Sequence, residues 1–64
     1  MTSKLYKYKR GLRVRVGKQV EDYGGKEGTV DGTGHRLGYE VVFVKFAAPH
    51  VDSVAFAPEE VDPL

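Results

Sequence analysis

The chain has no cysteine and no tryptophan among its 64 residues. Without cysteine it forms neither a disulfide nor a thiolate metal site, which fits a reducing compartment. No apolar run approaches the roughly 18 residues needed to cross a bilayer, and the polar N-terminus lacks the apolar core of a signal peptide. We therefore expect a cytoplasmic protein that is not inserted in a membrane.

The short length leaves little room for a catalytic cavity. A chain of this size forms one domain and buries only about 60% of the surface that its unfolded form exposes. Isolated carboxylates and hydroxyls supply no nucleophile with a nearby base, and His35, His50 and Asp52 are too scattered for a zinc site. The sequence thus predicts a non-catalytic protein with no cofactor, no metal and no small-molecule ligand.

Charge is distributed unevenly along the chain, although the formal net charge is only +1. Residues 1–18 hold seven lysines and arginines and no acid, whereas residues 19–64 hold three cations and nine acids. A basic segment of this kind attracts acidic partners, either nucleic acid or protein. The alternative is a solubilising surface that the protein's own acids neutralise.

The start of the chain predicts a strand with one apolar and one cationic face. Leu12, Val14 and Val16 alternate with Arg13 and Arg15, and side chains that alternate along a strand point to opposite faces of the sheet. The glycine-containing loop that follows and the short strand Gly28-Thr29-Val30 are typical of the beginning of a five-stranded SH3-like barrel.

The remaining pattern predicts an all-β fold with one 3₁₀ turn before the last strand. We expect strands at 11–16, 27–32, 39–46, 51–57 and 61–64, with a turn at 31–34 and a helical turn at 58–61. Proline and two acids favour the start of that helical turn. Pro63 is tolerable in the last strand only at a sheet edge. Residues 1–9 are expected to form a basic extended arm, and residues 10–64 the barrel.

Strand 39–46 is apolar on both faces, which in a small barrel is typical of a strongly bent strand shared by both halves of the core. The expected core consists of Leu12, Val14, Val16, Val30, Val41, Phe43, Val54 and Phe56. We also expect that Gly28 is needed for backbone bending or close approach.

Two segments resemble the KOW hairpin of ribosomal and transcription-elongation proteins. They are Gly11, Val14 and Val16, followed by Gly25-Lys26-Glu27-Gly28-Thr29-Val30. The resemblance implies binding of RNA or DNA.

A longer set of residues resembles subunit IV of the photosystem I reaction centre. It comprises Arg10-Gly11, Val14-Arg15-Val16, Gly28-Thr29-Val30, Tyr39, Val41, Val44, Phe46, Phe56-Ala57 and Glu59-Glu60-Val61. The segments 44–46 and 56–61 are also similar to the variable chain of ferredoxin–thioredoxin reductase. Both families are SH3-like barrels of the electron-transport-accessory group, in which basic residues dock acidic ferredoxin-type proteins. The resemblance implies such a role for Arg10 and Arg15.

A third resemblance implies an enzyme as a remote alternative. Gly38-Tyr39-Glu40-Val41 and the segment 53–58 are similar to plasmid-borne type II dihydrofolate reductases. In that family a glutamine and a tyrosine between the valine and the proline line the active pore. The corresponding residues here are Ala55, Phe56 and Ala57, which cannot make those hydrogen bonds.

The candidate contact residues lie in the arm and the first strand. They are Lys4, Tyr6, Lys7, Tyr8, Lys9, Arg10, Arg13 and Arg15. Aromatic side chains among cations suit base stacking and also protein interfaces, although the arm could instead pack on the barrel as an extra edge strand. We expect a docking module for an acidic protein surface, with KOW-type nucleic-acid binding as the alternative.

Overall fold

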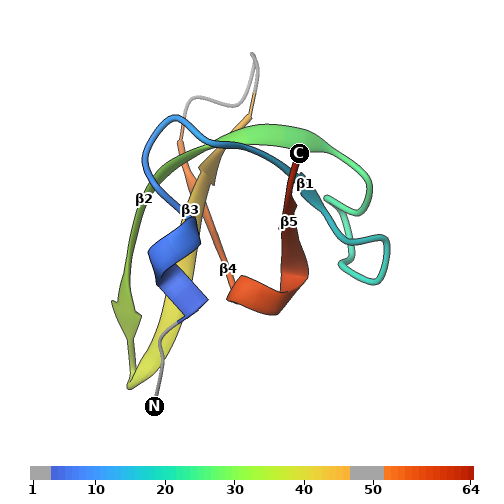
Figure 1. The fold of residues 1–64 in the computed structure, drawn as a ribbon. Coiled ribbons are helices and arrows are strands. Elements are labelled where there is room, and N and C mark those ends of the chain that lie inside the picture. Colours follow the sequence, from blue (N-terminus) through green and yellow to red (C-terminus); the bar gives the residue numbers. More distant parts are fainter. Residues whose placement is uncertain (1–3, 47–51) are drawn as a thin grey trace.

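Five strands form one antiparallel sheet in the computed structural model, which describes residues 4–46 and 52–64 (Figure 1). The strands are β1 (Arg13–Val16), β2 (Glu27–Arg36), β3 (Tyr39–Lys45), β4 (Val54–Phe56) and β5 (Val61–Pro63). The 3₁₀ turns are η1 (Lys4–Lys7) and η2 (Pro58–Glu60). Strand order is β4-β3-β2-β1-β5. The all-β class and the 3₁₀ turn before the last strand are confirmed, and the arrangement is compatible with an SH3-like fold.

The long strand β2 belongs to both halves of the sheet. Its first residues, Glu27 to Thr29, pair with β1, and its residues from Thr29 to Arg36 pair with β3. A register shift between Val30 and Gly32 marks a β-bulge, which increases the local bend of the strand. The far half of the β2–β3 hairpin therefore extends beyond β1 (Figure 1).

The prediction of a turn at 31–34 is wrong. Gly32 has a φ of 147° and lies beside the bulge, while the chain reverses at Leu37 and Gly38, whose φ values are 51° and 83°. Two consecutive positive φ values define the tight turn that matches the twist of paired strands. A glycine-rich segment can serve a bulge as well as a turn, and here it serves the bulge.

The ends of the other strands agree in part with the expectation. Strand β1 begins at Arg13 rather than at residue 11, because Gly11 has a φ of 94° and belongs to a turn. Strand β4 spans Val54–Phe56, and residue 51, where we expected it to begin, lies outside the described residues. Pro63 is in β5, at the edge of the sheet as expected.

The core uses the face of β3 opposite to the one expected. The buried hydrophobic side chains of the described part are Tyr8, Val14, Val16, Val30, Val42, Val44, Phe46, Phe56 and Val61. Val41 and Phe43 are only half-buried, so their assignment to the core is wrong. Val44 pairs with Val30, and directly opposed residues share a face of the sheet. The burial of Val30 thus decides which face of β3 points inward.

Leu12 and Val54, also expected in the core, are partly buried and pack against it.

Three aromatic rings pack together in another part of the interior. Tyr23 stacks on Phe46 with 5.1 Å between ring centroids, and Phe56 meets both rings edge to face, at 5.7 Å from Tyr23 and 6.1 Å from Phe46. Such pairs add to the stabilisation from apolar burial.

Gly28 allows β2 to lie against the end of β3. A Cβ atom at this position would be 2.6 Å from Val44 Cγ1 and 2.9 Å from the Lys45 carbonyl oxygen, which no side chain tolerates without movement. The expectation of close approach at Gly28 is confirmed.

The first prediction concerns the two phenylalanines on opposite faces. Phe56→Ala should cost about 3–5 kcal/mol of folding free energy, because the ring is 4% exposed in the core. Phe43→Ala should cost clearly less, because Phe43 lies half-buried on the outer face. Urea unfolding of both variants measures the difference, and equal losses would contradict the assigned faces.

The second prediction compares two glycines of β2. Gly28→Ala should lower the unfolding midpoint strongly, because the methyl group would collide with Val44 and with the Lys45 backbone. Gly34→Ala is the control, since its Cβ would meet only Phe43 Cε2, at 3.3 Å. If both variants unfold at the same temperature, the close approach at Gly28 does not limit stability.

Candidate binding surface

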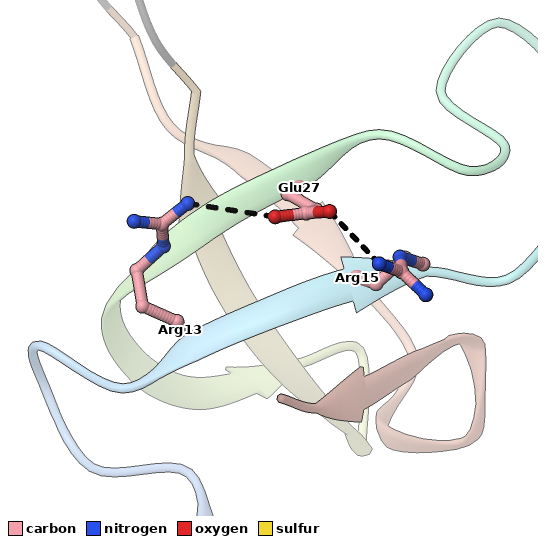
Figure 2. Close-up of polar contacts among 3 residues, drawn as sticks. All are labelled: Arg13, Arg15 and Glu27. Atoms are coloured by element: carbon pink, nitrogen blue, oxygen red, sulfur yellow. Dashed lines mark hydrogen bonds and ion pairs between the residues drawn. The ribbon is translucent and has the colours of Figure 1, made fainter.

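The outer face of β1 presents two arginines side by side. Val14 and Val16 are fully buried, so the alternating Arg13 and Arg15 point outward, with side chains 60% and 54% exposed. Figure 2 shows the Glu27 carboxylate between the two guanidinium groups, with N···O distances of 3.7 Å to Arg13 and 2.9 Å to Arg15. Because one carboxylate faces two guanidinium groups, this cluster retains positive charge.

Glu27 holds the Arg15 side chain in place. Strand register sets the two residues directly opposite each other, and Arg15 Nη2 donates a hydrogen bond to Glu27 Oε2. This hydrogen bond, together with the positive charge of Arg15 and then Arg13, lowers the pKa of Glu27. The carboxylate therefore stays ionised to lower pH than usual, and it orients the Arg15 guanidinium group and attracts that of Arg13.

Strand register places a third cation, Lys45, in the same row as Arg13. Arg13 lies opposite Thr29, and Thr29 lies opposite Lys45 on β3, so the three residues form one row on the outer face. Arg13, Glu27, Thr29 and Lys45 line a shallow hollow of about 300 Å³. We call Arg13, Arg15, Lys45 and Glu27 the arginine face.

The arginine face borders an acid on its other side. Asp62 of β5 is exposed and lies directly opposite Arg15 in the register. The cations of the N-terminal half are thus set among carboxylates from β2 and β5, and the charge separation seen along the sequence is reduced in space.

From Lys4 onward, where the structure describes it, the N-terminal segment is not an extended arm. Residues Lys4–Lys7 form η1, and Tyr8 is 3% exposed. The Tyr8 hydroxyl lies 2.8 Å from the Pro58 carbonyl oxygen and 2.7 Å from that of Val61, so its proton is shared between two backbone acceptors next to η2. Tyr8 consequently offers no contact surface, and the expectation that it binds a partner is corrected.

The other expected contact residues differ in their surroundings. Tyr6 is 71% exposed, and the Lys7 ammonium lies 5.4 Å from the centre of the Tyr8 ring. Lys9 and Arg10 are exposed, and Arg10 Nε donates a hydrogen bond of 3.2 Å to the Asp31 carbonyl oxygen. The side chain of Lys4 lies outside the described part of the molecule.

Sequence reasoning missed Glu27 and Lys45 as members of the surface. Their positions beside Arg15 and Arg13 depend on strand register, which alternation within a single strand does not reveal. The available signal was the antiparallel pairing expected between the first two strands, which would have opposed a carboxylate to the arginines.

Residues 4–46 and 52–64 contain no group of three or more histidine, cysteine, aspartate or glutamate side chains placed to hold a metal ion. Within the same ranges, no helix is long and apolar enough to cross a membrane. No protein-family model, curated protein or solved structure matches the chain.

The third prediction concerns Tyr8 and alkaline pH. Burial raises the Tyr8 pKa, and the negative charges of Asp62 and Glu59 raise it further. A raised pKa in the folded state means that the stabilisation is complete below the ordinary tyrosine pKa of about 10 and is lost as pH rises through the folded value.

Tyr8→Phe should therefore lower stability at neutral pH by about 1–3 kcal/mol, because two buried carbonyl groups lose their donor. Its stability should also fall less steeply than that of the parent at alkaline pH. Thermal unfolding across this pH range measures both effects, with Tyr6→Phe as the exposed control. Parallel pH profiles for Tyr8→Phe and the parent would contradict the role of the hydroxyl.

Proposed function

We propose that the protein is a non-catalytic docking module that binds an acidic protein surface through the arginine face, with Arg10 and the exposed lysines of the N-terminal segment at its border. The observation that supports it most is the pair of outward-facing guanidinium groups that share one carboxylate. Because the ion pairs with Glu27 already restrict both side chains, less side-chain freedom is lost when they bind a partner's carboxylate.

Charge balance favours a protein over a nucleic acid as the partner. Glu27 and Asp62 lie beside the arginines, so the surface is a pattern of alternating signs rather than a continuous cationic stripe. A phosphate backbone would meet both acids as like charges, whereas a protein can place its carboxylates against the guanidinium groups and its cations against the acids. The resemblance to photosystem I subunit IV likewise implies a docking role for Arg10 and Arg15, and Arg15 belongs to this surface.

Nucleic-acid binding of the KOW type is the second proposal, and it rests on a different feature. Tyr6 is 71% exposed and is followed in the sequence by the exposed Lys7 and Lys9, which would allow one base to stack next to phosphate contacts. With Tyr8 in the core, the segment offers one such ring rather than two. We do not propose dihydrofolate reductase activity, because Phe56 is in the core and Ala55 and Ala57 carry no polar group.

The fourth prediction tests the arginine face with an acidic plant-type ferredoxin as the probe. Addition of the ferredoxin to the isotope-labelled protein at low salt should shift the amide resonances of Arg13, Arg15 and Lys45. Arg13→Glu and Arg15→Glu should each weaken binding by about tenfold or more, because a cation becomes a like charge. Arg36→Glu makes the same change of net charge at the far end of β2 and should leave the affinity of a single copy for ferredoxin unchanged.

A titration with single-stranded RNA and duplex DNA separates the two proposals. Tight binding with a steep salt dependence would favour the nucleic-acid function. On duplex DNA the logarithm of the association constant should fall against the logarithm of the salt concentration with a slope of about −0.9 for each phosphate that the protein neutralises. Ferredoxin-induced shifts away from the arginine face, or none at low salt, would contradict the protein-docking proposal. Removal of residues 1–8 would not test either proposal, because the deletion would also take Tyr8 out of the core.

A further inference from the structure

The tip of the β2–β3 hairpin holds a leucine in an unfavourable position. Leu37 is 96% exposed and has a φ of 51°, and Gly38 follows with a φ of 83°. Turns of this type strongly favour asparagine or glycine at the first central position, because a bulky side chain is strained in the left-handed region. Leu37 is therefore both strained and placed in water, and strain of this kind clusters at functional contacts.

An apolar hollow lies next to this tip. Strand β4 pairs with β3 only along Val42 to Val44, and the chain then turns away into η2, so within the described ranges the first part of β3 has no strand on the side opposite β2. The resulting hollow has a volume of about 470 Å³. Its apolar lining consists of Tyr39, Val41, Ala55, Phe56, Ala57 and Pro58.

The charges of the tip and the hollow are complementary. Arg36 is exposed and directly precedes Leu37, so the tip presents an apolar side chain beside a cation. Glu40 and Glu59 line the hollow, which thus combines an apolar surface with two carboxylates. An exposed leucine beside an arginine is the kind of group that such a hollow accommodates.

We propose that a second copy of this chain occupies the hollow, with Leu37 of each copy inserted into the hollow of the other. Gly38 and Tyr39 belong to both features, because they follow Leu37 in the turn and also line the hollow. Tip and hollow therefore adjoin, and a two-fold axis beside them brings both pairs together at once. Such an isologous contact closes on itself as a dimer.

The dimer is weak, because the contact consists of two leucines, the Tyr39 rings and the flanking charges. Tyr39 is 76% exposed in the single copy and would be covered in the pair. We expect association in the micromolar to submillimolar range, which is typical of small interfaces. This surface is separate from the arginine face, so the two proposals succeed or fail independently.

The decisive variant is Leu37→Asn, which suits the turn better than the parent residue. Sedimentation equilibrium up to millimolar concentration should show dimer formation by the parent protein and only monomer for Leu37→Asn. At concentrations where both are monomeric, Leu37→Asn should unfold at a temperature higher by several degrees, because the strain is relieved. Leu37→Asn should thus lose association and gain monomer stability. A leucine that served only the fold of the single copy would not give this combination when it is replaced.

A charge exchange tests which surface receives the tip. Arg36→Glu and Glu59→Arg should each weaken association by about tenfold, through repulsion across the contact, and the double variant should restore it. Lys18→Glu, an equal change of charge on an exposed loop residue, should have no effect.

A parent protein that stays monomeric at millimolar concentration would overturn the proposal, as would association that survives Leu37→Asn. Binding to anionic phosphatidylserine vesicles that depends on Leu37, without self-association, would assign the tip to a membrane surface instead.

Discussion

The close approach of β2 to the end of β3 at Gly28 is the constraint on which the rest of the structure depends. With no side chain at this position, β2 pairs with β1 through Val14 while its backbone lies against Val44 and Phe46. The strand can then pass from one half of the sheet to the other within ten residues. The same passage sets Glu27 opposite Arg15 and Thr29 between Arg13 and Lys45, so the arginine face is a direct consequence of how the core is closed.

The parts of the fold that could be predicted are those for which the local sequence is compatible with only one structure. Val14 and Val16 alternate with charged residues, so only one face of β1 can be buried, and Pro58 followed by two acids favours a short helical turn. Strand β3 is apolar on both faces, so its orientation is set by the partner residue Val30 and not by its own pattern. The Tyr8 hydroxyl can be buried because it donates hydrogen bonds to two carbonyl oxygens some fifty positions away. No local rule encodes a contact of that range.

The candidate site illustrates the same limit in electrostatic terms. Composition along the chain indicated a cationic N-terminal segment and an acidic remainder, but the fold places acidic side chains next to the cationic ones. Arg15 lies between Glu27 and Asp62, and the negative charges of Glu59 and Asp62 act on the buried Tyr8 hydroxyl. Interleaved charges of both signs produce a weaker long-range field than a basic arm would, yet they specify the position of each partner charge more closely. Selectivity at this surface should therefore depend more on geometry than on net charge.

Strand β2 also sets the distance between the two proposed binding surfaces. The arginine face lies at its first residues and the hairpin tip follows its last, and ten residues of strand have a contour length of about 30 Å, which the bend at the bulge shortens in space. A two-fold contact between tips would leave both arginine faces uncovered, because they lie at the opposite end of β2. Each dimer could then engage two acidic partners, or two sites on one assembly, and the second contact would benefit from the high effective concentration created by the first. Weak self-association at the tip would in this way strengthen docking at the arginine face without any new contact to the partner.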